Sequence, residues 1–483
     1  MGASVNQRSD VDAVVVGSGP NGLVAAITLA EAGWRVLVLE AASQYGGGTR
    51  TEELTLPGFW HDTCSTVHPL ALASPALRQL RLEDDGLVLA HPEIALGHPL
   101  EPGRSRYLLQ DIEETIGELG PDATRWAATV GALGRRWRAL TDGVMEPLAI
   151  PPRTPLTSGA FGAAGLWPAT WFAKAVFTEP DTRALFAGLA AHATLDLSKP
   201  LTSAIGLLLG GLAHGVGWPV AVGGSSSIAD ALVRRLESLG GEVRTGHTVT
   251  SMADLPSARA VLFDVTPLQL LRIAGDRFPP SYRRKLASWR YGPGVFKVDW
   301  ALDGPVPWTD ERLAGAGTVH LGASMDEIVE SERAVALGRI PDRPYVLAAQ
   351  ATAADPTRAP AGKHTLWAYC HVPNGCAVDM TTAIEAQIER FAPGFAERVL
   401  ARHVMGPREL EAHNANQIGG DIAGGLSDLR QMAARPRLSL RPWTTPDRSI
   451  FICSSSTPPG GGVHGMCGRS AAQVVLRQWQ STR

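Results

Sequence analysis

The sequence predicts an α/β fold in which a Rossmann-like nucleotide-binding domain is interleaved with an α+β domain that contains a mixed or antiparallel sheet. Three observations predict it: a strand, glycine turn, helix and second strand at residues 12–40, a strand and glycine-rich turn at residues 449–466, and alternating apolar segments between them. The chain has 483 residues, which exceeds what one hydrophobic core usually supports, so two domains are expected.

The first unit carries the parts of a dinucleotide site. A β-branched run at residues 14–16 suits a strand buried on both faces of a parallel sheet, and residues 17–22 follow as G-x-G-x-x-G. These glycines permit a tight turn, approach of backbone N–H groups to a pyrophosphate and close packing of the helix, which begins near Asn21. Glu40 follows the strand at residues 35–39 and is placed to accept both hydroxyls of an adenosine ribose. An acid at this position disfavours the 2′-phosphate of NADP.

The glycine group at residues 46–48 favours FAD over NAD. It is followed by Thr49 and Arg50 and resembles the second fingerprint of FAD-binding flavoproteins, which NAD dehydrogenases do not usually carry. The C-terminal part agrees, because the apolar strand at residues 449–453 precedes a glycine-rich turn and a helix that is expected to start near residues 462–465.

These motifs, with the segment at residues 218–252, resemble those of the phytoene desaturase-related flavoproteins within the wider amine oxidase superfamily. The resemblance spans essentially the whole chain and implies a GR2-type FAD-binding domain, with Glu40 on the ribose, the Val249 backbone on the adenine and the C-terminal turn against the ribityl chain and flavin ring. It implies FAD contacts at Gly17, Ser18, Gly19, Pro20, Asn21, Gly22, Glu40, Ala41, Gly47, Gly48, Thr49, Arg50, Val249, Thr457, Gly461, Gly462, Val463 and Met466. Many relatives have Arg in place of Gly48, and many have Gly-Asp in place of Ser454-Ser455.

The two predicted domains alternate along the chain. The FAD-binding domain is expected at residues 1–70, 218–290 and 441–483, and the substrate-binding domain at residues 71–217 and 291–440. Hydrophobic periodicity predicts helices at residues 225–239 and 381–391, and strands at residues 242–245, 248–252, 258–265, 295–302, 345–352 and 365–372.

Composition and charge exclude several classes of protein. A net charge of −3 and a pI near 6.5 leave no basic footprint for nucleic acid. The five cysteines include no C-x-x-C pair, which excludes the redox pair of the disulfide reductases and favours reduced thiols, and no metal site is expected. Neither a signal peptide nor a membrane span is evident, so a soluble cytoplasmic protein is expected. The apolar segment at residues 159–177 has two interpretations, peripheral membrane contact and lining of the substrate cavity, and cavity lining is favoured. The sequence specifies no oligomeric state.

The candidate catalytic residues are Lys297, His464 and His68. Lys297 lies in GPGVFKVDWAL, which is similar to the amine oxidase segment whose lysine reaches flavin N5 through a water; the alternative is a strand-end lysine with its amine in solvent. His464 lies in the C-terminal glycine turn and His68 in TCSTVHPL, where relatives face the ring. Either imidazole suits proton transfer, and either has a structural hydrogen-bonding role as its alternative. Trp218 is the tryptophan expected to face the cavity.

The predicted function is that of an FAD-dependent oxidoreductase that transfers a hydride from a C–C or C–N position of a mainly apolar small molecule to flavin N5. No second G-x-G-x-x-G follows a strand, so O₂ or a quinone is expected to accept the electrons. The alternatives are an amine oxidase acting on a secondary-metabolite amine, an isomerase that uses the flavin without net redox change, and a non-catalytic FAD-binding protein.

Overall fold

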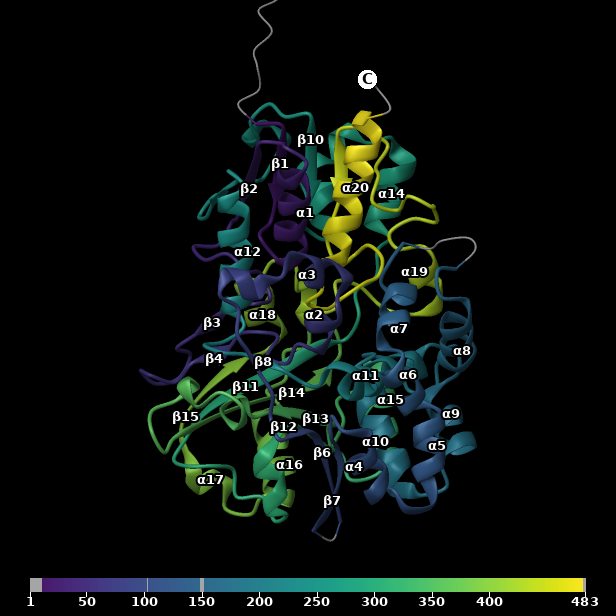
Figure 1. Cartoon of the computed structure of the whole chain (residues 1–483). Helices are drawn as coiled ribbons and strands as arrows, with labels where there is room; N and C mark the ends of the chain where they lie inside the picture. The colour runs from purple at the N-terminus through teal and green to yellow at the C-terminus, as the bar shows by residue number, and fades with distance from the viewer. Residues whose placement is uncertain (1–10, 102, 148–151, 481–483) are drawn as a thin grey trace, which may run out of the picture.

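The computed structural model describes residues 11–101, 103–147 and 152–480, and its architecture confirms the α/β class. The strands form two main sheets, one of five strands and one of seven. In Figure 1 the five-stranded sheet lies at one end of the molecule, where the first and last helices pack side by side, and the seven-stranded sheet lies toward the other end.

The five-stranded sheet is parallel, with the order β16-β10-β1-β2-β9. Its strands are Ala13–Val16 (β1), Val36–Leu39 (β2), Glu242–Arg244 (β9), Ala260–Phe263 (β10) and Ile450–Ile452 (β16). Three separate parts of the chain therefore supply one sheet. Because all pairs are parallel, the carboxyl ends of β1, β2 and β10 meet at the same edge, where ligands of open α/β sheets bind.

Helices cover both faces of this sheet. They are Pro20–Glu31 (α1), Ser226–Ser238 (α12) and Met466–Gln480 (α20) on one face, and Pro267–Ala274 (α13) and Pro280–Ala287 (α14) on the other. Successive residues of β1 pack on opposite layers, as the side-chain alternation of a strand requires. The helices α1 and α20 approach so closely that a Cβ at Gly468 would stand 1.8 Å from the carbonyl oxygen of Asn21. Only glycine fits at position 468.

The seven-stranded sheet has the order β15-β11-β14-β13-β12-β6-β7 and is antiparallel except for the pair β12 and β6. Its strands are Ile94–Leu100 (β6), Arg104–Leu108 (β7), Gly294–Leu302 (β11), Ala316–Leu321 (β12), Val346–Ala349 (β13), His364–Val372 (β14) and Val399–Met405 (β15). The antiparallel strands predicted at residues 295–302, 345–352 and 365–372 are therefore confirmed. The predicted helix at residues 381–391 is α16 (Thr381–Phe391), which packs on one face of this sheet.

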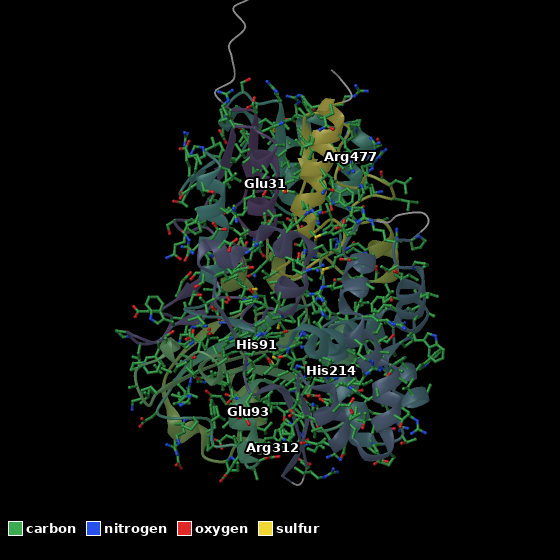
Figure 2. The ribbon with its side chains drawn as sticks, in the orientation of Figure 1. Glu31, His91, Glu93, His214, Arg312 and Arg477 are labelled. Atoms are coloured by element: carbon green, nitrogen blue, oxygen red, sulfur yellow. The ribbon has the colours of Figure 1, made fainter. Side chains whose placement is uncertain are left out.

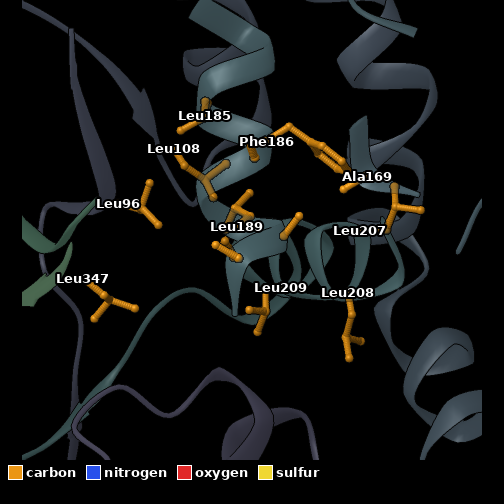
Figure 3. Packing of buried hydrophobic residues seen from close by; sticks show 14 of the residues in the cluster. Leu96, Leu108, Ala169, Leu185, Phe186, Leu189, Leu207, Leu208, Leu209 and Leu347 are labelled. Carbon is orange, nitrogen blue, oxygen red and sulfur yellow. The ribbon is translucent and has the colours of Figure 1, made fainter. Parts of the chain in front are cut away.

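The other face of the seven-stranded sheet packs against a layer of helices. Figure 3 shows Leu185, Phe186 and Leu189 of α10 beside Leu207 of α11, with Leu347 of β13 across from them. The helices of this layer are Ile112–Glu118 (α4), Ala123–Ala128 (α5), Val130–Arg135 (α6), Trp137–Val144 (α7), Pro155–Gly165 (α8), Ala169–Val176 (α9), Pro180–Ala191 (α10) and Thr202–Val216 (α11).

The strand predicted at residues 248–252 is absent, so that prediction was wrong. The backbone N–H groups of Thr250 and Ser251 donate to the Asp254 carboxylate at 2.8 and 2.9 Å, which removes them from pairing with a neighbouring strand. Within the described ranges, no helix combines the length and apolarity needed to cross a bilayer. Nor do three or more His, Cys, Asp or Glu side chains of these ranges group as metal ligands.

Candidate functional site

A cavity of about 910 Å³ extends from the carboxyl ends of β1, β2 and β10 to the helix-covered face of the seven-stranded sheet. One half, which we call the nucleotide half, is bordered by glycine turns, by the N-terminus of α1 and by the turn that leads into α20. In Figure 2, Glu31 and Arg477 mark the far ends of these two helices. The other half, the apolar half, is lined by residues that include Leu208, Leu209, Leu347, Trp367 and Tyr369. The cavity thus joins a polar groove to an apolar chamber.

The turn after β1 fixes the position of Glu40 in the nucleotide half. Glu40 Oε2 accepts hydrogen bonds from the N–H (2.9 Å) and hydroxyl (2.6 Å) of Ser18, and Oε1 accepts one from the Ala42 N–H (2.9 Å). The carboxylate lines the cavity and is only partly buried. It therefore keeps a defined orientation and has acceptor capacity left for the hydroxyls of a ligand.

The second glycine group lies directly against the first. Gly47 has a φ of 58°, and a Cβ there would stand 3.0 Å from Gly19 Cα, so both conformation and space favour glycine. Gly48 differs, because the nearest atom to a Cβ at that position is Cys64 Sγ, at an ordinary contact distance of 3.7 Å. The site therefore has room for a side chain at position 48, whereas positions 46 and 47, both at positive φ, favour glycine.

Thr49 and Arg50 hold this second turn in place. Thr49 Oγ1 donates to the Gly46 carbonyl (2.7 Å) and Arg50 Nε donates to the Gly47 carbonyl (3.0 Å). Arg50 Nη2 also donates to the His413 carbonyl (2.8 Å), which ties the turn to the segment that follows β15. Both side chains line the cavity. Their hydrogen bonds show that Thr49 and Arg50 hold the backbone of this turn in place as well as line the cavity.

Sequence reasoning missed Asp264, which follows β10 at the edge where the glycine turns lie. Its Oδ2 accepts a hydrogen bond from the Gly22 N–H (2.9 Å) in the first turn of α1, whose N-cap, Gly19, has no side chain to do so. Burial raises the pKa of Asp264 to about 7, and the nearby Glu40 charge adds to the effect, while the Gly22 hydrogen bond opposes it. The signal was present in the sequence, since an acid directly follows the buried run VLF.

The C-terminal turn borders the cavity through Gly461, Gly462, Val463 and His464. His464 Nδ1 accepts a hydrogen bond from the Met466 N–H (3.1 Å), so its hydrogen is on Nε2, which donates to the Gly460 carbonyl (3.2 Å). Burial lowers the pKa of His464 to about 4. Both nitrogens hold the turn against the start of α20, an arrangement that favours the structural alternative for this residue.

Lys297 is buried on β11 and is not part of the cavity wall. Its Nζ contacts both carboxylate oxygens of Asp299 at 2.5 Å and lies 5.4 Å from the centre of the Trp367 ring, which does line the cavity. Burial raises the pKa of Asp299, and the Lys297 charge opposes this. The lysine is thus neither a strand-end side chain in solvent nor a residue that borders the cavity; it neutralises a buried acid behind Trp367.

His68 lines the cavity and has a defined tautomer. The Ser225 hydroxyl donates to the Ser65 carbonyl, so its oxygen accepts the hydrogen bond from His68 Nε2 at 3.1 Å. His68 therefore carries its hydrogen on Nε2 and a lone pair on Nδ1, which has no partner among the residues that the structure describes. Burial lowers the pKa of His68 to about 4, and the charge of Asp62 opposes the shift. Nδ1 is thus the ring atom with an unused lone pair, and it is itself buried.

The structure brings most of the predicted residues to one cavity. Trp218 lines it, with its Nε1 donating to Thr318 Oγ1 (2.9 Å). Three predicted contacts do not border it: Gly22, Thr457 and Met466 lie behind the turns. The predicted residues that line it are Gly17, Ser18, Gly19, Pro20, Asn21, Glu40, Ala41, Gly47, Gly48, Thr49, Arg50, His68, Val249, Gly461, Gly462, Val463 and His464.

Comparison with known proteins finds similarity to nucleotide-binding and oxidoreductase proteins. Residues 15–80 match the family model described as an NAD(P)-binding Rossmann-like domain. The chain is similar to pyridine nucleotide-disulfide oxidoreductase domain-containing protein 2 of Rattus norvegicus, at 26% identity over 99% of this chain and 95% of that protein. It is also similar to the neurosporene-forming phytoene desaturase of Rhodobacter capsulatus, at 24% identity over 53% of each chain. Among solved structures, cyclohexylamine oxidase from Brevibacterium oxydans superposes with a TM-score of 0.59 at 16% identity, covering 98% of this chain and 100% of that one. This last likeness is one of fold.

Proposed function

We propose that this chain is an oxidoreductase of the superfamily that contains the amine oxidases and the phytoene desaturases, which its likeness to those proteins supports, and that it binds FAD in the cavity and removes a hydride and a proton from a mainly apolar small molecule. The observation that carries the proposal is the continuity of the nucleotide half with the apolar half. The FAD-binding unit would comprise about residues 1–70, 218–290 and 441–483, which supply every strand of the five-stranded sheet, and the substrate unit about residues 71–217 and 291–440.

The nucleotide half has the features that FAD requires. Two glycine turns leave their backbones open to a diphosphate, and the close contact between Gly47 and Gly19 disfavours a side chain at position 47. Glu40 would hold the adenosine ribose, and the turn at residues 459–464 would lie against the ring end. FAD, when bound, supplies the hydride acceptor.

His68 is the residue we assign to the proton. Its Nδ1 lone pair has no partner in the described ranges, and its Nε2–H is held by Ser225, which also donates its own N–H to Asp62 at 2.8 Å. The imidazole is thus fixed in the tautomer that a proton acceptor needs. Asp62 in turn pairs with Arg358 at 2.9 Å, so the negative charge of Asp62 behind His68 is balanced by a positive one.

The cavity favours loss of hydrogen from two adjacent carbon atoms over oxidation of a charged amine. Among described residues that line it, the carboxylates are Glu40, Asp264 and Asp421, and none stands on the helix wall or sheet floor of the apolar half. A protonated amine in the apolar half would therefore lack a counter-ion. An amine oxidase is the second candidate function, supported by the likeness of fold to cyclohexylamine oxidase. We propose O₂ or a quinone as the electron acceptor.

A pair of glycine variants tests the FAD site with an internal control. Gly47→Ala introduces a Cβ 3.0 Å from Gly19 Cα at positive φ, whereas Gly48→Ala meets only Cys64 Sγ at 3.7 Å. We expect FAD to bind the unmodified chain in preference to NAD and NADP, with an affinity that falls about tenfold in Gly47→Ala, from strain of about 1–2 kcal/mol, and is retained in Gly48→Ala. Isothermal titration of the flavin-free protein measures this. Equal losses in the two variants, or preferential binding of NAD, would contradict the assignment.

A further inference from the structure

Two histidines that sequence reasoning missed lie at the border of the apolar half. His192 is the C-cap residue of α10 and lines the cavity, while His320 is fully buried on β12 behind it. Their Nε2 atoms are 3.1 Å apart and their ring centres 5.1 Å apart. A hydrogen bond between two imidazole nitrogens requires that one of them carry the hydrogen and that the other offer a lone pair.

Gly188 of α10 decides which ring donates. A Cβ at Gly188 would stand 2.6 Å from His320 Nδ1, so a hydrogen of the glycine Cα points toward this nitrogen. His320 Nδ1 has no hydrogen-bond partner among the described residues. A hydrogen on Nδ1 would be crowded by the glycine and left unpaired in the interior, which is costly. The hydrogen of His320 is therefore on Nε2 and is donated to His192 Nε2.

His192 consequently carries its own hydrogen on Nδ1, for which the described part of the chain offers no acceptor. Burial lowers the pKa of His192 to about 3, and nearby His371 adds to the shift. Burial also holds the pKa of His320 well below its ordinary value, with further lowering by His192 and His98. Of the charged groups on this side of the sheet, Glu332 is paired with His371 at 2.8 Å and Lys297 with Asp299 at 2.5 Å. The pair stays neutral at physiological pH, so His192 donates a hydrogen bond and does not take up a proton.

We propose that His192 Nδ1–H is the polar anchor of the apolar half, and that the substrate is an apolar molecule carrying a hydrogen-bond-accepting oxygen such as a carbonyl. This inference rests on the proposed function, because it concerns the substrate of the same cavity. His320 is the positioning residue that fixes the tautomer. The indole N–H groups of Trp218 and Trp367 are already donated to Thr318 and Thr66, so they do not compete for the oxygen. A pure hydrocarbon would leave the His192 N–H unpaired.

The test compares two probes, carvone and limonene, which share a carbon skeleton and differ in a ring carbonyl. Each is titrated into the FAD-loaded protein and followed by tryptophan fluorescence, since Trp218 and Trp367 line the cavity. The quantity measured is the ratio of carvone to limonene affinity, and comparison of this ratio between variants cancels the different hydrophobicity of the probes. We expect His192→Phe to lower the ratio at least about fivefold and His192→Gln, which keeps an N–H donor, to lower it less.

Tyr369→Phe is the matched control, because Tyr369 also lines the cavity and carries a polar group. This variant is expected to change the ratio by no more than about twofold, which is smaller than the change expected when one hydrogen bond to the probe is lost. An unchanged ratio in His192→Phe, a loss confined to Tyr369→Phe, or failure of the unmodified protein to bind carvone would overturn the proposal.

The tautomer is tested directly on the unmodified protein, and a variant serves only to assign the signals. In protein labelled with ¹⁵N-histidine, we expect His192 to show a protonated Nδ1 and a bare Nε2, with no titration between pH 6 and 8; loss of its signals in His192→Gln assigns them. A bare Nδ1, or a ring that becomes charged in this range, would overturn the proposal. Absence of bound FAD would contradict the proposed function instead, while the ring assignment remains measurable.

Discussion

Replacing Asp264 by asparagine isolates the energetic cost of a buried acid at the mouth of the nucleotide half. The carboxylate accepts the Gly22 N–H, and the amide side chain that the change introduces retains an oxygen for this bond without a charge. Burial raises the Asp264 pKa to about 7 in the folded chain, whereas an unperturbed Asp titrates near pH 3.9 in unfolded peptides. Between these values the folded state binds a proton that the unfolded state has lost. Stability conferred by the neutral acid is therefore present at low pH and falls as pH rises toward 7.

The size of the effect follows from the two pKa values. The free energy of unfolding should fall by about 1.4 kcal/mol per pH unit in this window, which amounts to about 2 kcal/mol between pH 5 and 7 and levels off above it. Asp264→Asn lacks this dependence, so its stability relative to the unmodified protein should rise over the same range. Guanidinium unfolding at pH 5, 6, 7 and 8 measures the difference, with the exposed Asp276→Asn as control. A difference that is flat, or that falls with pH, would refute the reasoning.

Three further substitutions have expected outcomes. His68→Gln should slow anaerobic flavin bleaching by about 10²- to 10⁴-fold without changing FAD affinity; unchanged bleaching would remove His68 from proton transfer. Lys297→Met leaves the buried Asp299 without its ammonium partner, facing only His61 at 3.6 Å and His403 at 4.0 Å, whose pKa values burial lowers. Chemical unfolding should therefore show a loss of about 3–5 kcal/mol, largely restored by Asp299→Leu in the same chain; a stable single variant with slowed flavin reoxidation would instead favour a role at the flavin. Glu40→Gln should weaken FAD binding about tenfold or more in calorimetric titration, and unaltered affinity would argue against contact with the ribose.

The local units of the fold were predictable because their signals lie close together in sequence. The glycine turn, Glu40 and the buried run at residues 14–16 belong to one strand, helix and strand unit, and period-two alternation marks the long antiparallel strands β11 and β14. The strand predicted at residues 248–252 failed because the period-two pattern does not reveal that Asp254 captures the backbone N–H groups it would need.

The chemistry of the site was less predictable, since it depends on contacts between distant residues. His192 and His320 are 128 positions apart, and their shared hydrogen bond, which fixes a tautomer, exists only once α10 lies on β12. Lys297 was predicted to reach the flavin or solvent, whereas Asp299, two residues along the same strand face, pairs with its ammonium. His464 was singled out by its motif, but its two ring nitrogens are both engaged by backbone groups that only the folded turn supplies.

Anaerobic titration of the purified protein, reconstituted with FAD, tests the central claim most directly. The account predicts one FAD per chain, and bleaching of its visible absorbance by apolar carbonyl compounds that carry a removable hydrogen pair, with return of the oxidised spectrum when O₂ or a quinone is added. A protein that takes up no FAD, or whose bound FAD is bleached by amines and by no compound that loses hydrogen from two adjacent carbon atoms, would contradict it.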